Sequence, residues 1–252
     1  MSPIVQTHEL CKSFAGYRAI DDVSLSIEAG AIHAIIGPNG AGKTTFFNLL
    51  SGFATPTSGV VQFAGRDITG LAPHAVAQRG IVRSFQINSI FTHLTVLDNV
   101  KVSLESKTRL ATRFWLPGSS TRVLDARARE LLADVGLERE RDLLAAQLSY
   151  GRKRALELAI SLAQDPQVLL LDEPTAGMGS EDVGRITELI ARVRTGRTVV
   201  LVEHNLSVVA DLSDRITVLQ RGRVLVEGTY AKVRADRRVI DAYLGGGTAL
   251  HA

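Results

Sequence analysis

The sequence contains a single cysteine, Cys11, in 252 residues. One cysteine excludes an internal disulfide and a zinc site built from cysteines, which suits a protein of the reducing cytoplasm. Neither an apolar run of 18 residues nor a signal peptide is present, so we expect a chain that does not itself cross a membrane. Neither sign of charge dominates, since 29 Lys and Arg stand against 26 Asp and Glu. This balance does not exclude nucleic acid as a partner but gives no reason to favour it, and we expect none.

The hydrophobic pattern alternates between strand and helix periods along the chain. The composition, 45% hydrophobic and 22% charged, is typical of a soluble globular protein with a substantial core. Strands are expected at residues 4–10, 23–28, 31–36, 59–64, 167–172 and 198–203, with Ala29-Gly30 as a turn and a hairpin over 216–227. Helices are expected after residue 42, from a Thr95–Asp98 capping box to about Glu105, and over 121–135 (closed by Gly136), 152–164 and 181–194.

This order of elements predicts an α/β fold. Strand–helix alternation favours a parallel core, and the hairpins favour an antiparallel sheet beside it. Residues 87–165 look mainly helical, and 106–120 look like a loop or an insertion. We therefore divide the chain into a core of residues 1–86 and 166–244, a helical subdomain of residues 87–165, and a C-terminal tail of residues 245–252.

The strongest chemical signal is "GPNGAGKT", residues 37–44, which fits G-x-x-x-x-G-K-[ST] between an apolar strand and a helix. Glycines let backbone N–H groups turn toward a phosphate at a helix N-terminus, where the helix dipole favours an anion. Lys43 would add a charge between the β- and γ-phosphates, and the Thr44 hydroxyl would ligate Mg²⁺. The pattern predicts an ATP and Mg²⁺ site whose nucleotide-binding residues are Gly37, Pro38, Asn39, Gly40, Ala41, Gly42, Lys43, Thr44 and Thr45. The alternative, a glycine-rich turn that binds nothing, is disfavoured by the strand–helix context.

Two acids, Asp172 and Glu173, close the apolar stretch "VLLLDE". Ligands of an open parallel sheet bind beyond the carboxyl ends of its strands, so both acids should face the phosphate site. Asp172 would hold Mg²⁺ through water, and Glu173 would polarise an attacking water, which indicates hydrolysis rather than transfer to an acceptor. Without the phosphate-binding loop, the pair could also be two solvated turn acids.

Three further residues are candidates by position. His204 follows the strand expected at 198–203 and could steady charge that develops on the γ-phosphate, or could be an ordinary strand-end residue. Gln86 closes "VRSFQ" at the expected edge of the core, where a surface glutamine is also common. Phe14 precedes the phosphate loop, where an aromatic ring could stack on a purine, although core packing is the default for such a residue.

One helix begins with unfavourable charges, in "LSYGRKRALELAISLA", residues 148–163. Ser149 suits the N-cap and Gly151 the first bend. Arg152, Lys153 and Arg154 then crowd the first turn, where the helix dipole already supplies positive potential. These cations would weaken an isolated helix, so we expect an anion at this end.

These residues, in this order, resemble the nucleotide-binding subunit of an ABC transporter, over about Val5 to Leu244. The resemblance identifies Gly37–Thr44 as Walker A, Gln86 as the Q-loop, Leu148–Arg152 as the signature, Val168–Asp172 as Walker B, His204 as the H-loop and Phe14 as the A-loop aromatic. It implies the ABC ATPase fold, a P-loop NTPase core of mainly parallel sheet with an antiparallel β subdomain and an inserted helical subdomain. It also implies catalytic roles for Glu173, His204 and Gln86, and Mg²⁺ contacts for Thr44, Gln86 and Asp172.

In this family two such domains pair head to tail, so each ATP lies between one chain's P-loop and the signature of a second ATPase subunit, either a copy of this chain or a sister chain. The resemblance implies that Ser149 and Gly151 contact the γ-phosphate of the partner's ATP, and that the nearby cations add attraction. Two departures stand out. The signature reads LSYGR rather than LSGGQ, and Gly179 occupies the position where many relatives carry the D-loop Asp.

The stretches "GIVRSFQINSIFTHLTVLDNV", "EPTAGM" and "VIDAYLG" resemble the ATPase subunits of importers for branched-chain amino acids or urea and amides. This implies a peripheral protein on the cytoplasmic face of the inner membrane, held by two permease subunits and served indirectly by an external solute-binding protein. The permease surface is expected at residues 86–105. Phe91, Leu94 and Leu97 are candidate contacts there, or simply pack the subdomain.

Other functions share these motifs. An exporter ATPase, such as one for lipopolysaccharide extraction, has a similarly short domain, and a soluble ABC ATPase of DNA repair or cluster assembly shares every catalytic motif. A repair protein would carry a long coiled-coil insertion and a translation factor would carry two cassettes, and this sequence has neither. A kinase or GTPase would leave the signature and His204 unexplained. The stretch after Gln86 favours the importer.

Overall fold

The core of the molecule is a six-stranded sheet. The computed structural model describes residues 2–84, 90–108 and 118–244. The strand order is β10-β9-β3-β8-β7-β6, parallel throughout except for the β9–β10 pair. The strands are β3 (Ile32–Ile36), β6 (Ile81–Ser84), β7 (Val168–Asp172), β8 (Thr198–Val202), β9 (Arg215–Gln220) and β10 (Arg223–Gly228). The mainly parallel α/β core expected from the sequence is confirmed.

The central strands are apolar throughout because both faces of the sheet are covered. Leu169 and Leu171 of β7 belong to a hydrophobic cluster shared with the helices, whereas Val168 and Leu170 belong to a second cluster on the other face. The second cluster includes Phe46 and Phe47, both completely buried, from the helix that follows the phosphate loop. The loop is therefore anchored at both ends, by a buried strand and a buried helix.

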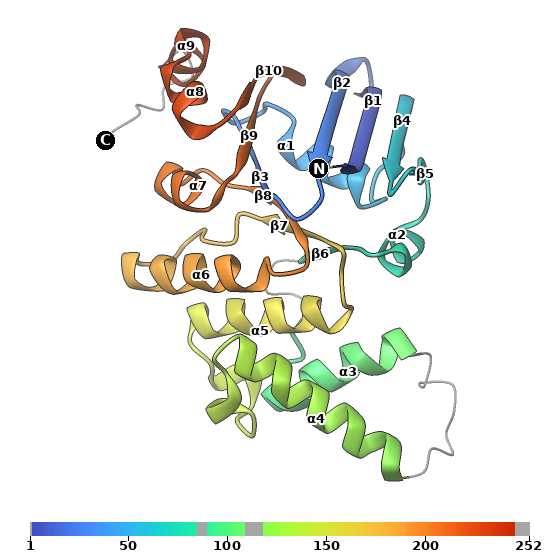
Figure 1. The fold of residues 1–252 in the computed structure, drawn as a ribbon, viewed down its shortest axis with the longest axis vertical. Coiled ribbons are helices and arrows are strands. Elements are labelled where there is room, and N and C mark those ends of the chain that lie inside the picture. The colour runs from blue at the N-terminus through green and yellow to red at the C-terminus, as the bar shows by residue number, and fades with distance from the viewer. Residues whose placement is uncertain (1, 85–89, 109–117, 245–252) are drawn as a thin grey trace.

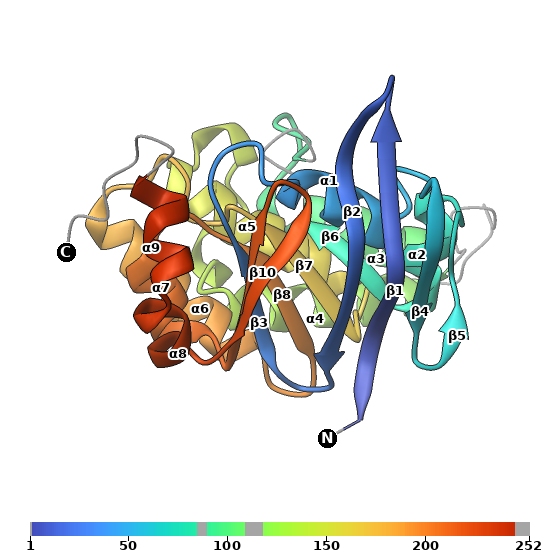
Figure 2. The ribbon, with the colours of Figure 1, turned by 90° about the horizontal axis from the view of Figure 1, so that it is seen from above.

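A second, four-stranded antiparallel sheet lies beside the core, in the order β2-β1-β4-β5. Its strands are β1 (Pro3–Phe14), β2 (Tyr17–Glu28), β4 (Ser58–Phe63) and β5 (Arg66–Asp67). Figure 2 shows this sheet along one side of the molecule, next to the six-stranded sheet. The expected antiparallel subdomain is thus present.

Two details of the sheets differ from the sequence prediction. Ala29-Gly30 does form a turn, but the strands it joins, β2 and β3, lie in different sheets, because the chain crosses from one layer to the other there. The predicted hairpin over 216–227 forms as β9 and β10, yet it extends the parallel core instead of the antiparallel sheet. Strand pairing of this kind depends on contacts distant in the sequence, which a local pattern does not carry.

Nine α-helices lie within the described residues. They are α1 (Lys43–Leu50), α2 (Pro73–Arg79), α3 (Val96–Thr108), α4 (Gly118–Asp134), α5 (Tyr150–Ala163), α6 (Ser180–Val193), α7 (Leu206–Leu212), α8 (Tyr230–Ala235) and α9 (Arg237–Leu244). Two short 3₁₀ turns, Glu138–Glu140 and Ala145–Gln147, connect α4 to α5. Within the described ranges, no helix is both long and apolar enough to span a bilayer.

Two predicted helix ends, the start at Thr95 and the close at Gly136, are confirmed. Thr95 Oγ1 accepts the Asp98 N–H at 3.0 Å, and α3 follows, running past Glu105. Gly136 has a left-handed backbone (φ 74°) and closes α4 as predicted, with hydrogen bonds from Gly136 N and Leu137 N back to the last turn. The expected loop at 106–120 was too wide at both ends, because α3 and α4 extend into it; residues 109–117 lie outside the described ranges.

Three of the helices, α3, α4 and α5, lie apart from the small sheet (Figure 1). Figure 1 shows α3, α4 and α5 at the lower end of the molecule, with β1, β2 and β4 at the upper end. The six-stranded sheet lies between them, and the carboxyl ends of β3, β7 and β8 meet at one edge because the strands are parallel and in register. The loops at residues 37–42, 173–179 and 203–205 therefore come together there.

Candidate functional site

The phosphate loop leaves β3 and enters α1 under tight steric constraints. A Cβ on Gly37 would lie 2.1 Å from Leu219 O, and one on Gly42 would lie 2.5 Å from Ala19 O. Both glycines have positive φ, 150° and 102°. Their backbones therefore pack closely against neighbouring carbonyls in conformations that other residues rarely adopt.

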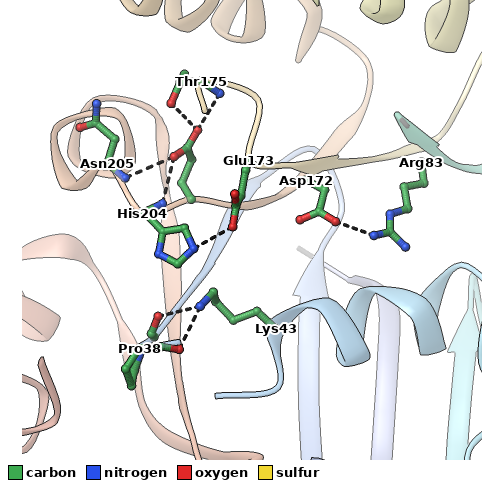
Figure 3. Close-up of polar contacts among 10 residues, drawn as sticks. Pro38, Lys43, Arg83, Asp172, Glu173, Thr175, His204 and Asn205 are labelled. Atoms are coloured by element: carbon green, nitrogen blue, oxygen red, sulfur yellow. Dashed lines mark hydrogen bonds and ion pairs between the residues drawn. The ribbon is translucent and has the colours of Figure 1, made fainter. Parts of the chain in front are cut away.

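The Lys43 side chain turns back over this loop and is only 6% exposed. Its Nζ donates hydrogen bonds to the carbonyl oxygens of Gly37 (2.7 Å) and Pro38 (3.0 Å) (Figure 3). Burial lowers the pKa of Lys43, and the carboxylates of Glu173 and Asp172 oppose that shift. The acceptors of this ammonium among the described residues are neutral carbonyls, so phosphate oxygens would be stronger acceptors for it.

The N-terminus of α1 has the character of an anion site. Within the described part of the chain, no side chain caps it at Gly42 and its first turn carries no acid. Thr44 is exposed and Thr45 half-buried at this end, beside exposed Asn39 and Gly40. Free N–H groups and the helix dipole both favour a bound phosphate here.

The first acid, Asp172, ends β7 and is held by Arg83 of β6. Arg83 donates to Asp172 Oδ2 at 2.5 Å and to Asn48 Oδ1 at 2.6 Å, and its guanidinium lies 5.8 Å from the centre of the Phe47 ring. The two side chains of the ion pair are 10% and 15% exposed. Nothing in the sequence pattern singled out Arg83; its signal is a cation inside the short apolar edge strand "IVRS".

The second acid, Glu173, meets His204 across the edge of the sheet. Glu173 Oε1 lies 2.7 Å from His204 Nε2, with the two side chains 36% and 43% exposed. The backbone of Glu173 is left-handed (φ 47°), unusual for a residue other than glycine, and its N–H donates to Val202 O at 2.9 Å. The structure thus brings together Lys43, Asp172, Glu173 and His204, as Figure 3 shows.

A third acid in this region, Glu203, escaped the sequence analysis. It is 3% exposed, and it accepts hydrogen bonds from Thr175, His204 and Asn205 (Figure 3). Its signal in the sequence is a carboxylate directly before the histidine at the end of an apolar strand.

The donor chemistry of this edge fits Mg²⁺. Its candidates are hydroxyl and carboxylate oxygens, Thr44 and Asp172, which are the hard ligands that this ion prefers. Among the described residues no group of three or more His, Cys, Asp or Glu could hold a metal alone. Mg²⁺ bound with a nucleotide needs only one or two protein ligands, because phosphates and water supply the rest.

Two of the predicted nucleotide contacts lie elsewhere in the chain. Ser149 caps α5, accepting the Arg152 N–H at 3.4 Å, and Gly151 is buried in the first turn, where a Cβ would lie 2.8 Å from the Asp182 carboxylate. The helix begins at Tyr150, two residues before its expected start. It packs on the opposite face of the six-stranded sheet from α1. The helices that follow Ser149 and the phosphate loop therefore cover opposite faces of the sheet.

The cations at the start of α5 already have anions within the chain. Arg152 pairs with Glu140 at 2.9 Å and also donates to Gly136 O. Arg154 pairs with the buried Glu157 at 2.9 Å. Both arginines therefore have carboxylate partners in their own chain, and the attraction they would add for a partner's phosphate stays a prediction.

The other candidates are placed as follows. Phe14 ends β1 and is 50% exposed, with Lys12 Nζ 4.9 Å from its ring centre. Gln86 lies outside the described residues. Gly179 is exposed at the N-terminus of α6. Tyr150, the residue in place of the usual signature glycine, donates its hydroxyl to Ala176 O at 3.0 Å.

An apolar cavity of about 280 Å³ lies between the core and the helical layer. Its lining includes Phe53, Arg83, Ser103 and Ile160, and Phe53 is 51% exposed. Of the three predicted permease contacts, Phe91 is exposed, Leu94 is half-buried and Leu97 packs against the main hydrophobic cluster. Phe53 was not among the predicted contacts, because its place beside this cavity depends on tertiary structure.

Family comparisons agree with the fold. Residues 20–176 match the family described as ABC transporter, and residues 223–249 match the family described as branched-chain amino acid ATP-binding cassette transporter. The chain is 37% identical over 250 residues to the high-affinity branched-chain amino acid transport ATP-binding protein BraF of Pseudomonas aeruginosa, covering 96% of this chain and 98% of that protein. It is also 35% identical over 237 residues to the lipopolysaccharide export system ATP-binding protein LptB of Escherichia coli, covering 94% and 95%.

Solved structures give the same result. The ADP conformation of MJ1267, an ATP-binding cassette of an ABC transporter, superposes with a TM-score of 0.86 at 29% identity, covering 97% of this chain and all of that chain. The dimeric structure of MJ0796, a bacterial ABC transporter cassette, superposes with a TM-score of 0.74 at 28% identity, covering 90% and 98%.

Proposed function

The chain belongs to the ABC transporter family and is an ATP hydrolase coupled to transport, and we propose that it energises an importer of branched-chain amino acids. The observation that carries the catalytic proposal is the convergence of Lys43, Asp172, Glu173 and His204 at one sheet edge. The substrate class rests on the similarity to BraF and on the second family match at residues 223–249.

In this proposal, ATP binds at the N-terminus of α1. Lys43 exchanges the carbonyls of Gly37 and Pro38 for phosphate oxygens, which accept hydrogen bonds more strongly because they are charged. The backbone of residues 37–45 surrounds the phosphates, and the exposed ring of Phe14 stacks on the base. Mg²⁺ would be held by Thr44 and Asp172, with Gln86 as a further ligand, and it would neutralise charge on the phosphates.

Hydrolysis uses the Glu173–His204 pair. The Glu173 carboxylate accepts a proton from an attacking water, and the His204 imidazole holds that carboxylate in place and faces the γ-phosphate. Gln86 assists in orienting the water. No acceptor other than water is required, which fits an ATPase rather than a kinase.

We further propose that two ATPase subunits share each site. Ser149 and Gly151, at the N-terminus of α5, would contact the γ-phosphate held by the partner's P-loop. The dimeric structure of MJ0796 supports a paired arrangement for this fold. Because Arg152 and Arg154 are paired within the chain, the attraction at this end would come mainly from the helix N–H groups and Ser149.

The membrane partner would be a pair of permease subunits, which hold this chain at the cytoplasmic face of the inner membrane. We place their docking surface at the cavity lined by Phe53, Ser103 and Ile160, together with the exposed Phe91. An external solute-binding protein would deliver the amino acid from the other side. The division into a core (1–86 and 166–244), a helical subdomain (87–165) and a tail (245–252) belongs to the same proposal.

A second candidate function is export, because LptB is also similar over most of the chain. The test is to purify the chain from native membranes through a tag, identify the permeases that accompany it and reconstitute them together in vesicles. ATP hydrolysis should rise when leucine, isoleucine or valine is supplied with the solute-binding protein. Stimulation by lipopolysaccharide instead would assign the chain to an exporter. Glu173→Gln is the control, with ATP binding kept and turnover about 10²–10⁴ lower.

A further inference from the structure

Glu203 carries a buried carboxylate with an unusual set of partners. Its side chain lies directly after β8 and is 3% exposed. Oε1 accepts hydrogen bonds from Thr175 N (3.0 Å) and Thr175 Oγ1 (2.6 Å). Oε2 accepts from His204 N (3.0 Å) and Asn205 N (3.2 Å). Among the described residues no Lys, Arg or His side chain forms an ion pair with it.

Burying the charge of a carboxylate costs free energy unless hydrogen bonds compensate for the lost water. Among the described residues, the hydrogen bonds that Glu203 accepts come from two loops at the catalytic edge, 174–176 and 203–205. A carboxylate that accepts four hydrogen bonds at once fixes the relative position of the groups that donate them. Glu203 therefore joins the segment after Glu173 to the segment that contains His204.

The joined segments hold a strained residue between them. Glu173 has a left-handed backbone, which persists only where the surrounding structure enforces it. On one side its N–H donates to Val202 O, and two residues later Thr175 is bound to Glu203. Val202 thus binds the Glu173 N–H, and Glu203 binds Thr175 two residues later. His204 Nε2 lies 2.7 Å from Glu173 Oε1.

From this geometry we infer that Glu203 is a positioning residue for ATP hydrolysis: it fixes the Glu173 carboxylate against His204 through Thr175. The inference rests on the proposed catalytic role of Glu173. The hydrogen bonds that Glu203 accepts come from Thr175, His204 and Asn205 rather than from the phosphate loop, so its loss should affect the chemical step and leave nucleotide binding by that loop unchanged.

The test uses Glu203→Gln, which keeps the shape but replaces one acceptor oxygen with a donor that faces N–H or O–H groups. We expect kcat to fall about 10–100-fold, the loss typical of a small misplacement of a reacting group, while KM and ATP affinity stay near the parent values. Thr175→Val should lower kcat in the same direction, and Thr175→Ser, which restores the hydroxyl, should recover most of it.

Asp214→Asn is the control at the opposite edge of the same sheet. Asp214 also accepts a backbone N–H, from Ile32, but it is exposed and pairs with Arg194. It should lose stability in thermal unfolding without loss of kcat per folded molecule. A folded Glu203→Gln with parental kcat would overturn the inference, as would equal kcat losses in Thr175→Val and Thr175→Ser. If Glu173→Gln itself hydrolyses ATP at the parent rate, the proposed function fails instead.

Discussion

Alanine variants at two glycines of the phosphate loop compare a position where an added Cβ would clash with one where it would meet no other atom. Gly37 has a neighbouring backbone in the way, since an added Cβ would lie 2.1 Å from Leu219 O. Gly40 has φ 77°, but an added Cβ would have no atom within 4 Å. Both variants would carry a strained positive φ, 150° at position 37 and 77° at position 40, and only Gly37→Ala would add a clash with a neighbouring backbone.

The expected magnitudes follow from these distances. Alanine at position 40 incurs only the cost of a left-handed backbone, about 1–2 kcal/mol. Alanine at position 37 must also move the loop or the Leu219 carbonyl by about 1 Å, because carbon and oxygen do not approach closer than roughly 3.4 Å without repulsion. Leu219 is 1% exposed within β9. Overpacking there should add about 1–3 kcal/mol of destabilisation.

Two measurements check this prediction. Denaturant unfolding gives the stability of each variant, and titration with a fluorescent ATP analogue gives its affinity. Gly37→Ala should be the less stable of the two and should bind ATP at least about tenfold more weakly than Gly40→Ala, a difference of roughly 1.4 kcal/mol. Equal affinity in the two alanine variants would refute the steric account of this loop.

Two further predictions concern stability. Arg83→Met removes the ion-pair partner of the half-buried Asp172 carboxylate and should cost about 1–3 kcal/mol in urea unfolding, whereas Arg185→Met, which loses exposed pairs, should cost under about 1 kcal/mol. Similar losses of unfolding free energy in the two variants would contradict a stabilising role for the Arg83–Asp172 ion pair. Burial lowers the pKa of His33 to about 4. Between pH 4 and pH 6.5 the His33 imidazole is therefore protonated more readily in the unfolded chain than in the folded one. Stability should therefore fall by roughly 3 kcal/mol as the pH drops from 6.5 to 4, and His33→Gln should show a smaller fall.

The catalytic edge was predictable because few residues had to be placed correctly. Apolar runs mark β3, β7 and β8 in the sequence, and parallel strands present their carboxyl ends at one edge. The loops that follow these strands must then meet. This reasoning places Asp172, Glu173 and His204 near the phosphate loop without knowledge of any side-chain contact.

The partners of these residues were not predictable from local patterns. Arg83 reaches Asp172 from an edge strand 89 positions earlier, and Glu203 binds Thr175 across 28 positions. The same limit explains why the turn at Ala29-Gly30 revealed nothing about the sheets it connects. It also explains why Glu140, the partner of Arg152, was missed, whereas Glu157 lies one helical turn after Arg154 and was within reach of the local pattern.

The central claim is that each hydrolytic site is built from two chains, and a doubly defective pair tests it most directly. Lys43→Ala should disable the P-loop side, and Ser149→Arg should block the signature side by bulk and misplaced charge. Each variant alone would be inactive at both sites. The two are co-expressed with different affinity tags and purified through both, so that every pair contains one copy of each. The mixed pair carries both lesions in one site and an intact second site, so its ATPase activity should return to about half of the parent level. A doubly tagged pair that stays as inactive as either variant alone would contradict the shared site.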